Sequence, residues 1–176
     1  LCVSSQAGCK MGCRFCMTGR QGFHGNLSAA DIINQFISVD EAAGLTNAVF
    51  MGMGEPLDNI DNGLAAIEIL TSDWGLGWSP HRITVSTVGL RRGLKRLAEE
   101  SQCHIAVSLH APSAEKRMCI VPAEKAFSMM EIIETLRHYD FSRQRRLSFE
   151  YTMFGGYNDS LSDAKELIKL LQGIPC

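Results

Sequence analysis

Gly8–Cys16 reads GCKMGCRFC and sets Cys9, Cys13 and Cys16 in the spacing C-x3-C-x2-C. The stretch comes shortly after Leu1–Ser5, a run with the character of a short strand. Cysteine thiolates hold iron–sulfur clusters, normally four to a cluster. Three thiolates in one loop, with no evident fourth, leave one iron open to bind a small molecule. We therefore predict a catalytic iron–sulfur centre in the loop after the first strand.

Other uses of these cysteines fit the sequence less well. Structural zinc sites take four ligands, usually as two separated pairs, and a second pair is missing because Cys2, Cys103, Cys119 and Cys176 each stand alone. Buried inert thiols do not suit a glycine-containing polar loop. Seven cysteines in 176 residues do not make the dense disulfide framework of a small secreted domain. A zinc-stabilised module stays open as an alternative.

The composition is that of a soluble globular domain, with 45% hydrophobic and 20% charged residues. A net charge of −2 argues against a module that binds nucleic acid by charge alone. Local basic faces remain compatible with it, although each is also typical of solvated helix faces and loop ends. The two basic clusters are Arg91, Arg92, Lys95 and Arg96, and Arg143, Arg145 and Arg146.

The chain shows no stretch of transmembrane length and no signal peptide. Free thiols around a cluster indicate a reducing compartment, so we expect a cytoplasmic protein with no membrane partner. The sequence begins at Leu1 without a methionine and ends at Cys176 just after a helical pattern. We interpret residues 1–176 as one domain from the middle of a longer protein.

Short β-branched runs alternate with helical patterns along the chain. The predicted strands are 1–5, 47–51, 82–87, 104–109 and 147–153, and the predicted helices are 28–43, 61–70, 90–100, 128–138 and 161–171. Ser28 with Asp31 resembles a capping box at the start of the first helix. Five strand–helix units predict an α/β fold with a parallel sheet and right-handed crossovers. Since a full barrel has eight units, we expect a partial βα barrel or an open sheet.

Function in such folds lies at the carboxyl ends of the strands, and polar motifs follow the predicted strands here. Gly52–Pro56 reads GMGEP, Ser86–Gly89 reads STVG and Ser108–Pro112 reads SLHAP. Taken singly, these are equally well a tight turn, a helix N-cap and a structural histidine. Their recurrence at consecutive strand ends, beside a three-cysteine loop, predicts one composite site.

The cysteine spacing after the first strand of a βα repeat resembles the radical S-adenosylmethionine (radical SAM) superfamily. Within it, the chain resembles the RlmN/Cfr group over nearly its whole length. The matching stretches are LCVSSQAGC at 1–9, TGRQGF at 18–23, MGMGEPLDN at 51–59, SLHAP at 108–112, Glu150-Tyr151, and GYNDS at 156–160.

The resemblance implies a radical SAM barrel that uses a [4Fe–4S] cluster and S-adenosylmethionine, with an electron donor such as flavodoxin or ferredoxin. RlmN proteins methylate C2 of an adenine in 23S ribosomal RNA and in some transfer RNAs, and Cfr proteins methylate C8 of the same ribosomal adenine. Adenine C2 is electrophilic, so transfer of a methyl cation does not work there and a radical route is needed. The target base must be reachable, which favours single-stranded or splayed RNA.

The resemblance also assigns residues. Cys9, Cys13 and Cys16 would ligate the cluster. Cys2 stands where the family keeps a redox-active cysteine that resolves an RNA adduct by forming a disulfide with a second cysteine. A small buried strand residue is the other interpretation of Cys2.

The binding of S-adenosylmethionine is assigned by position as well. Gly54 and Glu55 would hold its amino end, and Ser86 would contact its carboxylate or its ribose. The far side would be lined by Ser108, Leu109 and His110.

The chain departs from the family in three respects. The methyl-carrying cysteine, and the last strand with its ligand-binding asparagine, lie beyond residue 176. The upstream RNA-binding segment with its catalytic glutamate also lies outside the chain. Ile120–Lys125 reads IVPAEK where the family has Met-Pro-Ile-Asn-Lys, on what we expect to be the active face, which would mark a paralogue with another target.

We therefore expect residues 1–176 to bind a cluster without completing RNA methylation. Two alternatives stay open: a radical SAM enzyme with another substrate, through C8 methylation or a non-RNA target, and a non-catalytic iron–sulfur or zinc module.

Overall fold

The computed structural model describes residues 1–141 and 147–176. Its central element is a four-stranded parallel sheet with the spatial order β3 (Ala48–Phe50), β4 (Ile83–Thr87), β5 (His104–Ser108) and β6 (Leu147–Glu150). Consecutive strands are neighbours, as in an arc of a βα barrel. The predicted α/β class and partial barrel are therefore confirmed.

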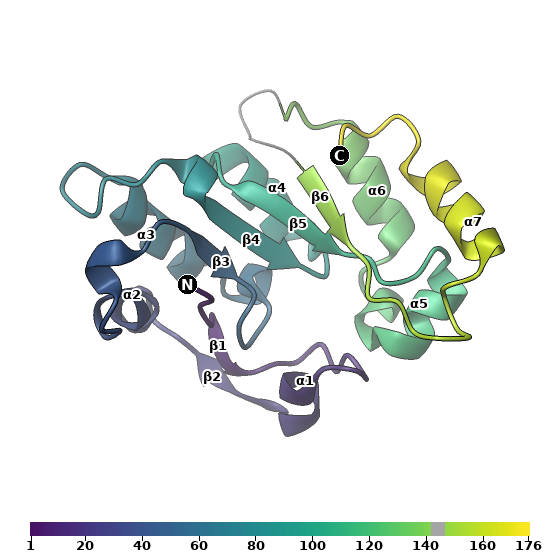
Figure 1. The fold of residues 1–176 in the computed structure, drawn as a ribbon, viewed down its shortest axis with the longest axis horizontal. Coiled ribbons are helices and arrows are strands. Elements are labelled where there is room, and N and C mark those ends of the chain that lie inside the picture. Colours follow the sequence, from purple (N-terminus) through teal and green to yellow (C-terminus); the bar gives the residue numbers. More distant parts are fainter. Residues whose placement is uncertain (142–146) are drawn as a thin grey trace.

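Helices α3 (Ile60–Thr71), α4 (Arg91–Glu100) and α6 (Met129–Arg137) lie behind the sheet in the view of Figure 1. Apolar side chains of the strands and helices form one core cluster, which includes Phe50, Val85, Ile105, Leu70, Leu94 and Ile132. β4 is rich in β-branched residues, and its side chains are buried at every second position. The apolar core thus lies between the strands and these helices, whereas polar residues stand at the carboxyl ends of the strands.

Leu1–Ser5 forms less of a strand than the sequence predicted. Cys2 makes an isolated parallel bridge with Val49, and Val3 N–H donates to the Val49 carbonyl oxygen at 2.9 Å. The segment thus extends the sheet beyond β3, but the regular ladder stops after this bridge. Its next residues turn into a different pairing.

That pairing is an antiparallel hairpin, which the sequence analysis did not predict. β1 (Gln6–Gly8) pairs with β2 (Phe23–Asn26), and the short helix α1 (Met17–Gln21) lies between them. In Figure 1 this hairpin lies below the carboxyl ends of the parallel strands. The cysteine loop is therefore carried to the edge of the sheet where the polar motifs end.

The remaining helices differ from the predictions mainly in length. α2 (Ala29–Ile37) has the predicted capping box of Ser28 and Asp31 but ends at Ser38, well before residue 43. α5 (Ala114–Ile120) was not predicted, whereas α7 (Leu161–Leu171) has the predicted bounds. Among the described residues, no helix is both long and apolar enough to cross a membrane.

Candidate active site

The cysteine loop is anchored at both ends by backbone hydrogen bonds. Cys9 N–H donates to the Gly22 carbonyl oxygen (2.9 Å), and Arg14 N–H donates to the Ile120 carbonyl oxygen at the end of α5 (2.9 Å). Gly8 has a φ of +80°, and a Cβ there would lie 1.9 Å from the Gly22 oxygen. Only glycine permits this approach, so Gly8 fixes where the loop leaves the hairpin.

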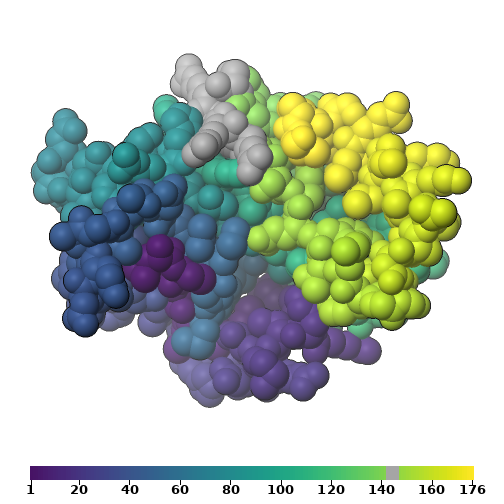
Figure 2. All heavy atoms as spheres, in the orientation of Figure 1, coloured from purple at the N-terminus to yellow at the C-terminus, as the bar shows by residue number. Residues whose placement is uncertain are grey.

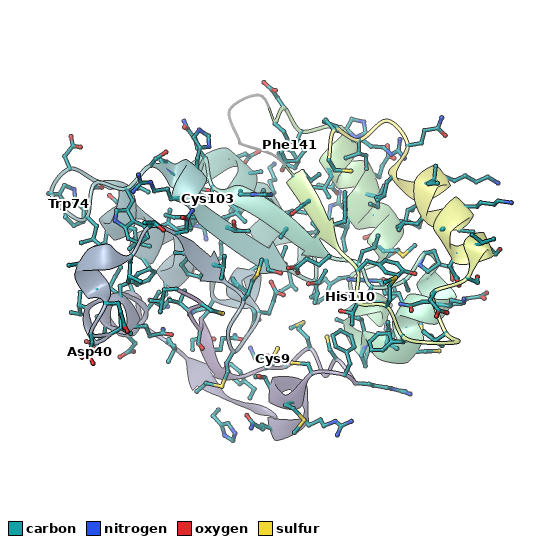
Figure 3. All side chains as sticks on the ribbon, in the orientation of Figure 1. Cys9, Asp40, Trp74, Cys103, His110 and Phe141 are labelled. Atoms are coloured by element: carbon teal, nitrogen blue, oxygen red, sulfur yellow. The ribbon has the colours of Figure 1, made fainter. Side chains whose placement is uncertain are left out.

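The loop closes one side of a cavity of about 360 Å³ at the carboxyl ends of the strands. Cys9 and His110 lie on either side of the space between the hairpin and the strand ends in Figure 3. The lining includes the predicted residues Cys9, Cys13, Cys16, Gly54, Glu55, Ser86, Ser108 and His110, together with Met11, Phe15, Thr87, Val88, Glu150 and Thr152. Residues from four strand ends and the cysteine loop therefore share one chamber.

Burial disfavours the thiolate form of two thiols in this chamber, Cys9 and Cys13. Burial is the main cause that raises the pKa of Cys13 to about 11, and the nearby Cys9 and Cys16 raise it further. Burial also raises the pKa of Cys9. A cationic centre reverses this preference, because bound metal stabilises the thiolate form. Cys9 and Cys13 would therefore become thiolate ligands only when a cationic centre binds.

Cys9, Cys13 and Cys16 all line the cavity from one loop. In an iron–sulfur cluster each thiolate takes its own iron, so these three residues are the ones that would hold a cluster. Across residues 1–141 and 147–176, no three His, Cys, Asp or Glu side chains are placed together as ligands of one metal ion.

Glu55 is nearly fully buried and its carboxylate is held by three donors. Oε1 accepts from Thr87 Oγ1 (2.6 Å) and Leu57 N–H (3.0 Å), and Oε2 accepts from Val88 N–H (2.9 Å). Burial raises the Glu55 pKa to about 7, although these hydrogen bonds oppose the rise. Glu55 therefore ties the loop after β3 to the end of β4.

The glycine before it brings the same loop against the hairpin. Gly54 has a φ of +99°, and a Cβ there would lie 2.5 Å from the Gln6 side chain. Gln6 Oε1 accepts from Glu55 N–H (2.9 Å), and its Nε2 donates to Asn26 and to Asp58. Gln6 is fully buried, so it acts as the link between the cysteine hairpin and the loop after β3.

His110 adopts an unusual backbone conformation at the mouth of the cavity. Its φ is 59°, in the left-handed region that non-glycine residues rarely occupy outside functional or tightly held sites. Its Nδ1 accepts from Thr152 N–H (3.1 Å), so the neutral ring carries its proton on Nε2. Burial is the main cause that lowers the His110 pKa to about 4. The ring of Phe15 packs edge-on against it, with centroids 4.9 Å apart.

The cysteine loop also reaches the segment after β6. The rings of Phe15 and Phe154 lie 5.5 Å apart. In the space-filling view of Figure 2, the purple hairpin region lies against the yellow-green atoms of the β6–α7 connection. The ring contact thus joins the cysteine loop to the segment after β6.

Two predicted site residues lie outside the cavity lining. Leu109 is 1% exposed, with its side chain in the protein interior. Cys2 is exposed beside β3, and all seven cysteines are free thiols in the described structure. The disulfide that the resemblance implied for Cys2 is therefore not formed, and its redox role stays a prediction.

Ile120–Lys125 also does not line the cavity, contrary to the expectation that it lies on the active face. Its Glu124 is 4% exposed and forms an ion pair with the fully buried Arg117 (2.5 Å). Arg117 further donates to the carbonyl oxygens of Val88, Ser108 and Leu109. The segment thus supports the strand ends and the cysteine loop from outside.

Glu150 is a site residue that the sequence analysis quoted in a matching stretch without giving it a role. Its Oε2 accepts from Ser86 Oγ (2.6 Å) and from Ser108 Oγ (2.9 Å). The three residues come from β4, β5 and β6 and line the cavity together. The predicted strand ran to residue 153, so Glu150 stood inside it and was not recognised as a strand-end residue, whereas β6 ends at Glu150.

Comparisons with known proteins agree with this geometry. The profile of the radical SAM superfamily matches residues 3–171. The probable dual-specificity RNA methyltransferase RlmN of Phocaeicola vulgatus is 63% identical over 176 residues, which are 100% of this chain and 50% of that protein. The dual-specificity RNA methyltransferase RlmN of Syntrophobacter fumaroxidans is 46% identical over 178 residues, covering 99% of this chain and 52% of that protein.

A solved structure has the same fold. The crystal structure of a radical SAM methyltransferase from Sphaerobacter thermophilus superposes with a TM-score of 0.94 at 41% identity, covering 99% of this chain and 53% of that one. The chain spans about half the length of the curated relatives that it matches.

Proposed function

The chain belongs to the radical SAM superfamily, and from this premise we propose that it forms the core of an RNA methyltransferase that modifies C2 of an adenine in 23S ribosomal RNA and transfer RNA. The observation that carries the proposal is the single chamber in which three thiols face polar residues from the parallel strand ends. The names of the relatives at 46–63% identity supply the reaction and the substrate class.

Family membership implies a [4Fe–4S] cluster and S-adenosylmethionine, and the cysteine loop fits the cluster. When bound, the reduced cluster supplies the electron that cleaves S-adenosylmethionine. The chain's own residues would bind the cluster, orient S-adenosylmethionine and shield both from water. Cys9, Cys13 and Cys16 would hold the cluster, while Gly54 and Glu55 would position the amino end of S-adenosylmethionine.

Water exclusion is the second task of the chamber, because radical chemistry needs protection from side reactions. Met11, Phe15 and Val88 give the lining apolar surface next to the thiols. His110 presents Nε2–H as a hydrogen-bond donor, since Thr152 occupies its Nδ1. We expect the Nε2–H group to orient the ligand by hydrogen bonding and not to transfer its proton.

The hairpin gives RNA a suitable approach. Residues 1–30 contain Lys10, Arg14 and Arg20 and no acidic residue, and of these Lys10 forms an ion pair with Asp58 from outside the segment (2.8 Å). Arg14 and Arg20 are exposed on this hairpin, so phosphates passing the chamber would meet positive charge.

The basic cluster on α4 is a weaker candidate for RNA contact. Arg96 forms ion pairs with Asp61 and Glu100, and Lys95 with Glu99. Two of its four cations are thus compensated within the chain. The other cluster, Arg143, Arg145 and Arg146, lies outside the described residues.

The same proposal includes a flavodoxin or ferredoxin as electron donor and a cytoplasmic location, supported by the free state of all seven cysteines. Cys2 would serve as the redox-active cysteine that resolves the RNA adduct.

Anaerobic reconstitution tests the proposal. The complete protein should become brown, bind about four irons, and release 5′-deoxyadenosine from S-adenosylmethionine on reduction. Expressed in a bacterium that lacks its own enzyme, it should restore 2-methyladenosine in 23S ribosomal RNA. A colourless zinc-containing protein, or restored modification at C8 instead of C2, would overturn the assignment. The variant Cys119→Ser is the control, because it removes an exposed cysteine outside the chamber.

A further inference from the structure

Gln6 is the buried side chain through which the cysteine hairpin contacts the loop after β3. It is fully buried, and both ends of its amide are used. Oε1 accepts from Glu55 N–H (2.9 Å), while Nε2 donates to Asn26 Oδ1 (2.8 Å) and to Asp58 Oδ2 (2.7 Å). Asn26 belongs to the hairpin strand β2, whereas Asp58 lies in the short 3-10 helix after Glu55. One amide group therefore joins both strands of the hairpin to that loop.

The Gln6 side chain continues a contact that the backbone begins. The N–H groups of Ser5 and Gln6 both donate to the Met53 carbonyl oxygen (2.9 and 3.1 Å). At the next residue, a Cβ at Gly54 would lie 2.5 Å from the Gln6 side chain, and the Gln6 amide then holds the Glu55 N–H. Gln6 thus fixes the position of the two residues that we expect to hold the amino end of S-adenosylmethionine.

The same network reaches the cysteine loop through Asp58 and Lys10. Asp58 Oδ2 accepts from Gln6 Nε2 and also pairs with Lys10 Nζ (2.8 Å). Lys10 directly follows Cys9. A continuous path of hydrogen bonds and one ion pair therefore runs from the Glu55 backbone to the residue beside the first cysteine of the loop. Binding groups have to be held to within about 0.5 Å, and side chains locked by packing and hydrogen bonds do this.

Such a link matters because the ligand would be held from two sides. Under the proposed function, S-adenosylmethionine meets the cluster on the hairpin side and Gly54 and Glu55 on the strand side. Two contacts made by one molecule strengthen each other only when their spacing matches that molecule. The hairpin and the parallel strands form separate sheets, so the contacts between them must set this spacing.

We propose that Gln6 is a positioning residue, which sets the spacing between the cysteine loop and the loop after β3 so that S-adenosylmethionine contacts both at once. The inference rests on the proposed function, because it assumes that this ligand occupies the chamber. Gln6 itself lies outside the chamber lining, so it acts through Glu55 and Asp58 and touches no ligand. Its loss should therefore weaken only those ligands that span the two loops.

The test compares S-adenosylmethionine with 5′-methylthioadenosine, which keeps the adenosine but lacks the amino acid portion. Calorimetry measures both affinities in the reconstituted complete protein, with the cluster left oxidised so that the ligand is not cleaved. Gln6→Met keeps the length of the side chain and removes its donors and its acceptor oxygen. It should weaken S-adenosylmethionine by roughly 10-fold or more, because the two contacts no longer form together. The affinity for 5′-methylthioadenosine and the iron content should stay nearly unchanged.

A paired exchange keeps the test decisive even where Gln6→Met folds poorly. Gln6→Glu together with Asp58→Asn reverses the donor and the acceptor of one hydrogen bond and keeps the total charge beside Lys10. The exposed Asn26 can rotate its amide to donate to the new carboxylate. The pair should therefore bind S-adenosylmethionine like the wild type. Gln21→Ala, at an exposed glutamine of the same hairpin, is the matched control and should leave both affinities unchanged.

Each contrary outcome has a distinct meaning. If Gln6→Met weakens both ligands equally, the inference is overturned, because a merely structural loss acts on both. An unchanged affinity for S-adenosylmethionine overturns it as well, and so does a loss of iron, which would mean that Gln6 holds the cluster itself. A paired exchange that binds as weakly as Gln6→Met would show that the hydrogen bonds are not the cause. These outcomes leave the proposed function standing, whereas a wild type that binds neither ligand overturns it together with this inference.

Discussion

Three glutamates near the strand ends show why single residues resisted prediction. Glu55 accepts backbone N–H groups and Thr87, Glu124 accepts Arg117 and a backbone N–H, and Glu150 accepts two serines. The sequence singled out Glu55 from its glycine-rich motif but gave no comparable signal for Glu150. What separates a structural from a ligand-facing carboxylate is its set of donors, which only the three-dimensional arrangement supplies.

Arg117 offers a prediction at this scale, because its buried guanidinium holds three strand-end carbonyls and Glu124. Arg117→Met leaves the Glu124 carboxylate buried and unpaired, which should cost about 3–5 kcal/mol of unfolding free energy. Urea denaturation measures this cost. The exposed Arg92→Met should change stability by less than about 0.5 kcal/mol.

A second variant separates the ion pair from simple packing. Adding Glu124→Gln to Arg117→Met removes the unpaired charge, so the double variant should recover roughly 1–3 kcal/mol through coupling. If the stability losses of the two single variants simply add up in the double variant, the Glu124 carboxylate does not depend on Arg117 for its stability.

At the scale of elements, prediction succeeded where a pattern was local and long. α7 has its predicted bounds, and the capping box of Ser28 and Asp31 forms as expected. The hairpin of β1 and β2 was missed, since its strands of three and four residues gain their pairing from contacts made elsewhere in the fold. α2 ended early at Ser38 because Ser38, Val39 and Asp40 are weak helix formers.

The hairpin makes a testable element, since its geometry depends on Gly8. Gly8→Ala puts a methyl group 1.9 Å from the Gly22 carbonyl oxygen at a φ of +80°. A backbone oxygen cannot move aside as a flexible side chain would. We therefore expect the free energy of unfolding to fall by about 2–4 kcal/mol and iron binding to be impaired. Gly25→Ala has no atom within 4 Å of its new Cβ and should bind iron normally. Equal iron content in the two variants would contradict the assigned role of Gly8.

The cap of α7 predicts a pH dependence through Asp163. Hydrogen bonds from Lys116 and then Ser160 hold the Asp163 pKa below its ordinary value. An acid with a lowered folded pKa stabilises the fold above its unfolded pKa of about 3.9, and this contribution disappears as the pH falls through the folded value. Asp163→Asn should therefore be less stable than the wild type at pH 7 by urea denaturation. The two proteins should converge in strong acid, and a gap independent of pH would show that the charge plays no part.

At the scale of the whole molecule, the site is assembled by topology and not by any one segment. Parallel strands bring their carboxyl ends to one edge, which is why three separate motifs could be predicted to meet. Their meeting with Cys9, Cys13 and Cys16 depends on the hairpin, whose place below that edge (Figure 1) no local pattern encodes. The fold class and most lining residues, including Ser86 and Ser108, were therefore predictable, whereas the place of Glu150 beside the two serines was not.

The separation between the parallel sheet and the hairpin with the cysteine loop predicts that the barrel arc folds without its cluster. The main core cluster contains Cys103 but none of the three loop cysteines, and all three loop cysteines lie within eight residues of one another in a loop anchored by backbone bonds. A metal centre whose ligands are so local constrains that loop and not the sheet, unlike a zinc finger, whose whole fold depends on its ion. The variant Cys9→Ser with Cys13→Ser and Cys16→Ser should lose its iron. Its far-UV circular dichroism should match that of the cluster-free wild type, and its unfolding free energy should differ from it by less than about 1 kcal/mol. Hydrogen exchange should show protected amides in β4 and β5 in both proteins. An unfolded triple variant would mean that the thiols stabilise the arc itself, and that the cluster loop is part of the folding core.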